Sequence, residues 1–154
     1  MHLFEENIKN LGLNIPELPK ALANYVPYKI VEKTMYISGQ APVQNGELIY
    51  KGKVGSDITI EDGIEAARLC VTNIIAAVKT GLEGDWDKLD SFVKLTGFVN
   101  CQDDFTDQPK IINGASDMLV DIFRDQGRHA RVAVGSSALP LCIAVEIDAI
   151  VQLK

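Results

Sequence analysis

An uninterrupted alternation near the C-terminus, from Leu141 to Leu153, is the sequence feature that most restricts how this chain can fold. Every second residue in it is apolar, and in an extended strand every second side chain lies on the same face of a sheet. The pattern therefore predicts a strand that packs one face against a core. The opposite face would carry Glu146 and Asp148, so two carboxylates are expected outside that core.

Two helices are predicted by apolar residues that recur at three- and four-residue intervals. The first begins at the capping pattern formed by Thr59 and Asp62, and it ends at Gly81. The second contains Pro109, which suits the first turn of a helix, and stops before Gly127. Each helix has one apolar face, so both should pack on a common layer.

Further strands are predicted where apolar residues alternate with polar ones. Met35–Gly39 and Leu89–Asn100 both show this pattern. An Asn45-Gly46 turn signal follows the first of them and predicts that Glu47–Val54 pairs with it as a hairpin. The first pairing of the sheet should therefore be antiparallel.

The order of these elements predicts an α+β fold, in which a single sheet carries two helices packed on one face. Before the sheet, helical spacing predicts a short helix at Leu3–Leu11, and three prolines predict an irregular arm from Leu13 to Tyr28. With 154 residues and no internal linker, we expect one domain over residues 1–154, of which residues 1–22 form the N-terminal helix and arm.

The alternation also assigns side chains to the two faces of the sheet. In the strand before the last, Val132 and Val134 are expected on the core side. Arg131 would then point away from the helices and lie beside Glu146 on the outer face. That face should also carry three aromatic residues, Tyr36, Phe92 and Phe98. A second copy of the chain is the simplest cover for such a surface, and an open polar face is the alternative.

Composition and charge restrict the classes of partner. The net charge of −6 and the pI of about 4.9 disfavour a nucleic-acid partner, because such partners are held largely by Lys and Arg. No apolar run approaches the ~20 residues that span a membrane, and the N-terminus carries acidic residues where a signal peptide carries basic ones. We therefore expect a cytoplasmic protein without a membrane partner.

Metal and cofactor motifs are not found in the sequence. Cys70, Cys101 and Cys142 have no paired spacing, so reduced and structural thiols are expected. His2 and His129 are too few and too far apart in sequence to indicate a metal site, and there is no Gly-rich phosphate loop. We expect no metal and no cofactor.

Several short motifs, taken in order, resemble those of a known family. They are NYVP at 24–27, SGQ at 38–40, NGASD at 113–117, HAR at 129–131, LP at 139–140 and VEIDAI at 145–150. The chain resembles the Rid (YjgF-like) reactive-intermediate deaminases, also known as the endoribonuclease L-PSP family, and within it the branch with NYVP and GRHAR motifs. This resemblance implies a chorismate-mutase-like fold, a homotrimer with three clefts between subunits, and hydrolysis of 2-imino acids to 2-oxo acids and ammonia.

The resemblance also implies two catalytic residues. Arg131 matches the arginine that binds the substrate carboxylate, and its planar fork suits a bidentate contact. The alternative is an ion pair with Glu146 or Asp148. Glu146 matches the residue that orients the attacking water, and a carboxylate beside an arginine should stay ionised. Its alternative is a simple salt-bridge partner.

Four further positions match the substrate-binding residues of the family. Tyr25 matches the tyrosine that closes over the ligand, or it packs within the arm. Gly39 matches the position whose backbone N–H contacts the carboxylate, or it only serves a turn. Asn113 matches an asparagine near the cleft, or it bonds locally within its helix. Ala133 stands where the founding deaminases often have cysteine, so we expect the cleft and its substrate to differ from theirs.

Three functions from different classes remain open on the sequence alone. The first is imine hydrolysis, in which an electrophilic substrate needs positioning, a water and a base. The second is a non-catalytic protein that binds or senses small carboxylates. The third is the endoribonuclease or translation-inhibitor activity linked to some relatives, which the acidic charge disfavours.

Overall fold

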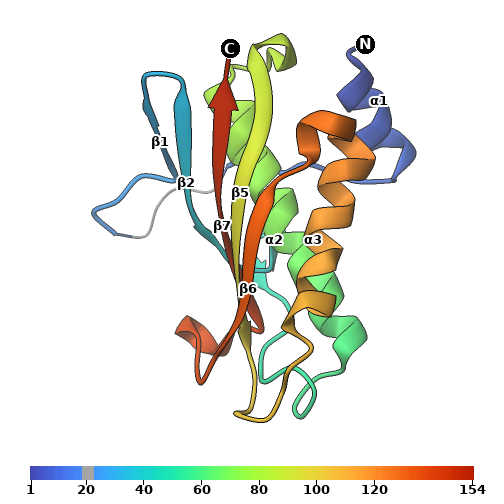
Figure 1. The fold of residues 1–154 in the computed structure, drawn as a ribbon, viewed down its shortest axis with the longest axis vertical. Coiled ribbons are helices and arrows are strands. Elements are labelled where there is room, and N and C mark those ends of the chain that lie inside the picture. Colours follow the sequence, from blue (N-terminus) through green and yellow to red (C-terminus); the bar gives the residue numbers. More distant parts are fainter. Residues whose placement is uncertain (19–22) are drawn as a thin grey trace.

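A five-stranded mixed sheet forms the centre of the protein, with its strands in the order β1-β2-β7-β5-β6 (Figure 1). The structure is a computed structural model that describes residues 1–18 and 23–154, so Pro19 of the predicted arm lies outside it. The strands are β1 (Tyr28–Val31), β2 (Thr34–Gln40), β5 (Leu89–Asn100), β6 (Ala130–Ser136) and β7 (Val145–Leu153). Neighbouring strands are antiparallel except β5 and β6, which are parallel because a helix returns the chain between them.

Two helices, α2 (Ile60–Gly81) and α3 (Gln108–Phe123), cover one face of this sheet, as Figure 1 shows. The Thr59 hydroxyl accepts a hydrogen bond from the Asp62 N–H at 3.1 Å and so caps α2 as predicted. Pro109 lies in the first turn of α3, where its missing N–H costs nothing. The predicted α+β architecture, a single main sheet with two helices on one face, is confirmed.

The short helix α1 (Leu3–Asn10) packs against the C-terminal end of α3 and extends the core. Its Phe4 ring lies 4.9 Å from that of Phe123, in an edge-to-face arrangement. Glu5 is held by Lys79 at 2.8 Å and by the Trp86 indole at 2.7 Å. These contacts confirm the predicted N-terminal helix and tie it to the rest of the fold.

The smaller elements complete the chain. A separate two-stranded sheet is formed by β3 (Val43–Gln44) and β4 (Glu47–Leu48), and three 3-10 turns are η1 (Trp86–Lys88), η2 (Arg124–Gly127) and η3 (Pro140–Cys142). In the described parts of the chain no helix is both long and apolar enough to span a membrane.

The predicted hairpin between Met35–Gly39 and Glu47–Val54 is wrong. The Asn45-Gly46 turn does form, with φ values of 52° and 79°, but it joins only the short strands β3 and β4. Both edges of β2 are already paired, one with β1 and the other with β7. The turn signal was therefore correct locally, while the long β7 strand took the partner position.

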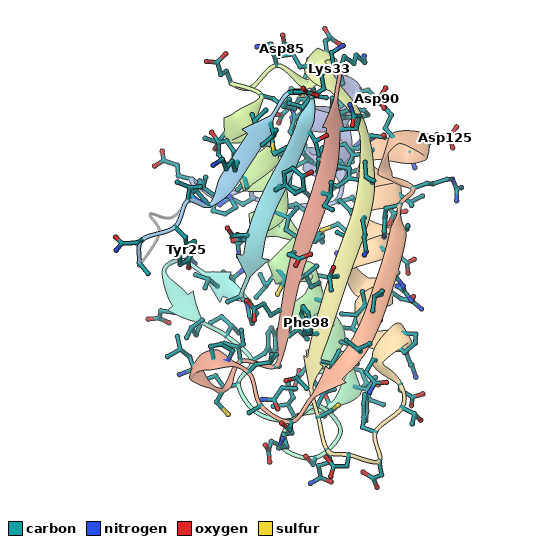
Figure 2. The ribbon with its side chains drawn as sticks, turned by 60° about the vertical axis from the view of Figure 1, so that its left-hand side comes forward. Tyr25, Lys33, Asp85, Asp90, Phe98 and Asp125 are labelled. Atoms are coloured by element: carbon teal, nitrogen blue, oxygen red, sulfur yellow. The ribbon has the colours of Figure 1, made fainter. Side chains whose placement is uncertain are left out.

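A β-bulge reverses the predicted orientation of Phe92. The register between β5 and β7 shifts on both sides of Phe92, at Leu89/Ser91 and at Phe92/Lys94. An extra residue in one strand turns the following side chains to the other face. Phe92 is consequently 1% exposed and packs on Phe123 in the core. Phe98, beyond the bulge, keeps the predicted outer position opposite Glu146 (Figure 2).

The predicted faces of β6 are also reversed. Val132 and Val134 are each 41% exposed on the outer face, whereas Arg131 pairs in register with the buried Leu95 and lies on the helix side. The valines make their set the more apolar one, but hydrogen bonds from Arg131 to residues of α3 hold the other set on the helix side. The strand predicted from Leu141 begins only at Val145, and Leu141 is 68% exposed in the preceding turn.

Candidate functional site

Glu146 lies on the outer face of β7, directly opposite Phe98 of β5. Its carboxyl group is half-buried, and this burial raises its pKa above the ordinary value of 4.5. The negative charge of Asp148, two residues along the same face, raises the pKa further. Arg131 is not among the causes of this shift within one chain, so the expected lowering of the pKa of Glu146 by an adjacent arginine is not seen there.

Gly39 contacts Glu146 across the boundary between β2 and β7. The register of these strands shifts between Ile37 and Gln40, so Gly39 lies in a bulge. A Cβ atom added to Gly39 would lie 2.4 Å from Glu146 Oε1, so the backbone of Gly39 and the carboxylate lie side by side. A larger residue at position 39 would displace the Glu146 carboxylate. The structure thus brings together two of the predicted site residues.

Tyr25 lies on the segment that runs beside this end of β2. The Ser38 N–H donates to the Pro27 carbonyl at 2.9 Å, and the Ser38 hydroxyl donates to the Val26 carbonyl at 2.7 Å. These bonds hold the NYVP segment against the strand that carries Gly39. The Tyr25 side chain is exposed at the β2 edge of the sheet (Figure 2).

Arg131 lies at the other edge of the sheet and is held by α3. One terminal nitrogen donates to the Ser116 hydroxyl at 3.1 Å, and the other donates to the Pro109 carbonyl at 3.2 Å. The predicted placement beside Glu146 is wrong, since Arg131 faces the helix layer. A hollow of about 300 Å³ opens next to it and is lined by Asn113, Ser116, Val120, Arg128, His129 and Arg131.

Ser116 and His129 connect to Arg131 through a chain of hydrogen bonds. His129 Nδ1 lies 2.6 Å from the Gly127 carbonyl, which can only accept, so we assign the ring proton to Nδ1. The bare Nε2 then accepts from the Ser116 hydroxyl at 2.9 Å, while that oxygen accepts from Arg131. The hydroxyl dipole is thereby oriented with its oxygen towards the guanidinium.

The imidazole of His129 is neutral near neutral pH. Burial lowers its pKa below the ordinary value of 6.5, and the positive charge of Arg131 lowers it further against the opposing effect of the bond to Gly127. Neither Ser116 nor His129 was predicted to belong to the site. Both lie within the NGASD and HAR motifs, but only the packing of α3 on β6 shows that they meet.

Asn113 and Ala133 both lie on the Arg131 side of the molecule. Asn113 lines the hollow, in line with its predicted position near a cleft. Ala133 shares the face of Arg131 on β6 and packs against the core, so it offers no polar atom to the hollow. Cys142, in contrast, is exposed in the turn before β7, whereas Cys70 and Cys101 are buried as expected of structural thiols.

The predicted residues therefore form two separate groups in one chain. Arg131 and Asn113 lie where α3 packs on the β6 edge, and Gly39 and Glu146 lie on the outer face where β2 pairs with the central strand β7. Strand β5 lies between β6, which carries Arg131, and β7, which carries Glu146. Arg131 pairs with Leu95 of β5 and Glu146 pairs with Phe98, so they are also three register positions apart along β5. With strands roughly 4.8 Å apart and a rise of roughly 3.3 Å per residue, their Cα atoms are about 14 Å apart. One small substrate does not span this distance across the sheet.

The fold and these two polar groups define a class of protein. A mixed sheet with two helices on one face, and a parallel β5-α3-β6 unit at its edge, is the architecture of the chorismate-mutase-like proteins. Residues 5–152 match the family model described as "YjgF/chorismate_mutase-like, putative endoribonuclease". The chain belongs to this YjgF family, which confirms the family resemblance of its motifs.

Individual relatives agree with this family over nearly the whole chain. Protein TCP17 of Trypanosoma cruzi is 38% identical over 149 residues, which are 96% of this chain and 92% of TCP17. The crystal structure of Atu1372 from Agrobacterium tumefaciens, a protein of unknown function, is 41% identical, with a TM-score of 0.93 and coverage of 99% and 93% of the two chains. YyfA of Yersinia pestis, described as a conserved Rid family protein of unknown function, is 27% identical, with a TM-score of 0.63 and coverage of 88% and 93%.

Proposed function

We propose that the protein hydrolyses reactive 2-imino acids to 2-oxo acids and ammonia, in clefts formed between the subunits of a homotrimer. The observation that carries this proposal is the separation of the two polar groups within one chain, with Arg131 at the β6 edge on the helix side and Glu146 on the outer face of the central strand β7. A ring of copies related by rotation repeats the same contact between two different surfaces. Such a ring would bring the Arg131 hollow of one subunit to the Gly39 and Glu146 pair of the next.

The exposed apolar residues of the outer face support an assembly of this kind. Tyr36 of β2, Val93 of β5, and Val132 and Val134 of β6 are all well exposed there. A monomer would leave this apolar surface in water, and its burial between copies supplies a hydrophobic driving force for association. The same association would cover Glu146 further and strengthen the electrostatic contacts within the cleft.

The side chains of the two groups are suited to the chemistry of imine hydrolysis. Arg131 has N–H donors left after its bonds to Ser116 and Pro109, and these would hold the substrate carboxylate. Water then adds to the carbon of the protonated imine, and a water proton passes to Glu146. The product of this step is a carbinolamine. A carboxylate of raised pKa is a suitable acceptor, because its pKa lies nearer the working pH.

The second step breaks the C–N bond. Glu146 returns the proton to the amino group, which makes it a leaving group. Ammonia departs as the carbonyl forms, and the hydroxyl proton passes back to Glu146 and then to solvent. In total, one protonated imine and one water are converted to one 2-oxo acid, one ammonia and one proton.

A second function, binding of small carboxylates without catalysis, is favoured by one specific feature. The hollow around Arg131 is built entirely from one chain, with its hydrogen bonds already made. A carboxylate could therefore be bound there without any contribution from Glu146. Endoribonuclease activity has no comparable support, because the hollow holds one neutral histidine and the chain carries a net charge of −6.

A coupled assay with an amino-acid oxidase separates these functions. The oxidase generates imines from several amino acids, and the decay of each imine is followed with and without the protein. We expect Glu146→Gln to bind 2-oxo acids normally but to slow hydrolysis at least tenfold, about 1.4 kcal/mol of barrier. Hydrolysis at the wild-type rate by a folded Glu146→Gln protein would remove Glu146 from the mechanism. Cleavage of a labelled RNA that is lost in Arg131→Ala would favour the nuclease instead.

A further inference from the structure

The hollow beside Arg131 contains a second arginine that a single carboxylate does not require. Arg128 lines the same hollow, three residues before Arg131. Its Nε donates to Asp125 at 3.4 Å, but the Arg128 side chain is 70% exposed and that of Asp125 is 99% exposed. Exposed pairs of this kind contribute little and are readily displaced. The terminal nitrogens of Arg128 are therefore available to a ligand.

The lining of the hollow is positively charged, unlike the chain as a whole. Arg128 and Arg131 contribute two permanent positive charges, and the described residues that line the hollow include no Asp or Glu. His129 is neutral near neutral pH, because burial lowers its pKa. In a chain with a net charge of −6, this local surplus favours a ligand with two negative groups.

The size of the hollow fits such a ligand. Its volume of about 300 Å³ is at the small end of the range of ligand pockets. A five-carbon acid with two carboxylates is smaller than this and can enter the hollow. Asn113 and Ser116, which also line the hollow, are uncharged and can bond the part of the ligand between its two ends.

We propose that the site takes 2-imino dicarboxylates, which are the imines of acidic amino acids. Arg131 would bind the carboxylate next to the imine carbon, and Arg128 would bind the distal carboxylate. An enzyme that oxidises acidic amino acids to imines must then supply the substrate. This proposal rests on the function proposed above for the choice of an imine, but the selectivity for two carboxylates is a property of the hollow alone.

Calorimetric titration with two oxo acids of equal chain length tests this selectivity. 2-Oxoglutarate and 2-oxopentanoate differ only in the second carboxylate. We expect the wild-type protein to bind 2-oxoglutarate at least tenfold more tightly, and Arg128→Ala to lose that advantage while its affinity for 2-oxopentanoate changes less than about twofold. Arg131→Ala should weaken the binding of both acids.

Arg68→Ala provides a matched control. Arg68 pairs with Glu65 at 3.6 Å with the same three-residue spacing, but it does not line the hollow. Its removal changes the net charge by the same amount and should leave both affinities unchanged.

Four results would overturn the proposal, and the first three come from the titration of the wild-type protein and the variants. They are equal wild-type affinity for the two oxo acids, an equal effect of Arg128→Ala on both, and the same loss in Arg68→Ala as in Arg128→Ala. Competition by inorganic phosphate as effective as that by 2-oxoglutarate would also overturn it, since the hollow would then bind any anion. Because the titration contains no imine, a protein without hydrolase activity can still show the predicted selectivity, so the two proposals can fail separately.

Discussion

Replacement of Gly39 by alanine should reduce hydrolysis strongly while leaving the fold intact. The added Cβ would lie 2.4 Å from Glu146 Oε1 and 3.1 Å from Glu146 Cδ. A carbon and an oxygen that are not bonded approach comfortably to roughly 3.3 Å, so the carboxylate must retreat by about 1 Å. Oε1 is the end of a flexible side chain, and the displacement needs no movement of the backbone.

The size of the effect follows from the geometry of catalysis. A misplacement of about 1 Å at the reacting groups can cost on the order of 100-fold in rate. We expect kcat to fall by about 10- to 100-fold in Gly39→Ala. Stability should change by less than about 1 kcal/mol, which is roughly 2–4 °C in Tm for a domain of this size. Binding of 2-oxo acids through Arg131 should persist.

Gly81→Ala is a control with the same steric overlap elsewhere. The Cβ atom added at position 81 would lie 2.4 Å from the terminal methyl of Met35, which is fully buried. Overpacking costs about 1–3 kcal/mol, and the gain from alanine in a helix offsets part of that cost. The Tm should therefore change while kcat of the folded protein does not. The coupled oxidase assay and a thermal melt measure both. Wild-type kcat in a folded Gly39→Ala protein would refute the claim that this glycine sets the position of the Glu146 carboxylate.

Three further results are expected. The hydrolysis rate should fall as the pH drops through the pKa of Glu146, which lies above 4.5, because the base must be ionised. This loss of rate at acidic pH should be absent from any residual activity of Glu146→Gln. If the loss persists in that variant, it belongs to another group. Ser116→Ala should raise KM more than it lowers kcat, because it removes the hydroxyl that holds Arg131. Ser116→Thr should restore KM. An equal KM in the two variants would exclude positioning of Arg131 by the hydroxyl. Phe98→Asp should weaken assembly in sedimentation, since the charge would be buried without an assured partner, and an unchanged mass would place Phe98 outside the interface.

The helices and long strands could be predicted because several local signals agree in each of them. In α2 the apolar spacing, the Thr59 cap and the stop near Gly81 all indicate the same element. The β5 strand was found with its full bounds, Leu89–Asn100, from alternation alone. Where one signal acted by itself, as at the Asn45-Gly46 turn, it identified the turn and not the strand partner.

The faces of the edge strand and the bulge could not be predicted, because they depend on contacts between distant segments. In β6 the set with Val132 is the more apolar of the two, but α3 supplies Ser116 and Pro109 as hydrogen-bond acceptors to Arg131 and so places the other set on the helix side. The bulge at Phe92 is set by pairing with β7. Motif resemblance predicts Gly39 and Glu146 as site residues, but their contact arises from a second bulge in β2 that the sequence does not reveal.

Mixing two inactive variants tests most directly whether the site lies between subunits. Arg131→Ala keeps Glu146, and Glu146→Gln keeps Arg131, so a cleft that takes one residue from each variant is complete. If the subunits are unfolded together in equal amounts and refolded, random association in a closed ring gives about one quarter intact clefts. We predict that this mixture recovers about a quarter of the wild-type hydrolysis rate, well above either variant alone. A mixture no more active than the mean of the two variants, with mixed trimers demonstrated by mass spectrometry, would contradict a site shared between subunits.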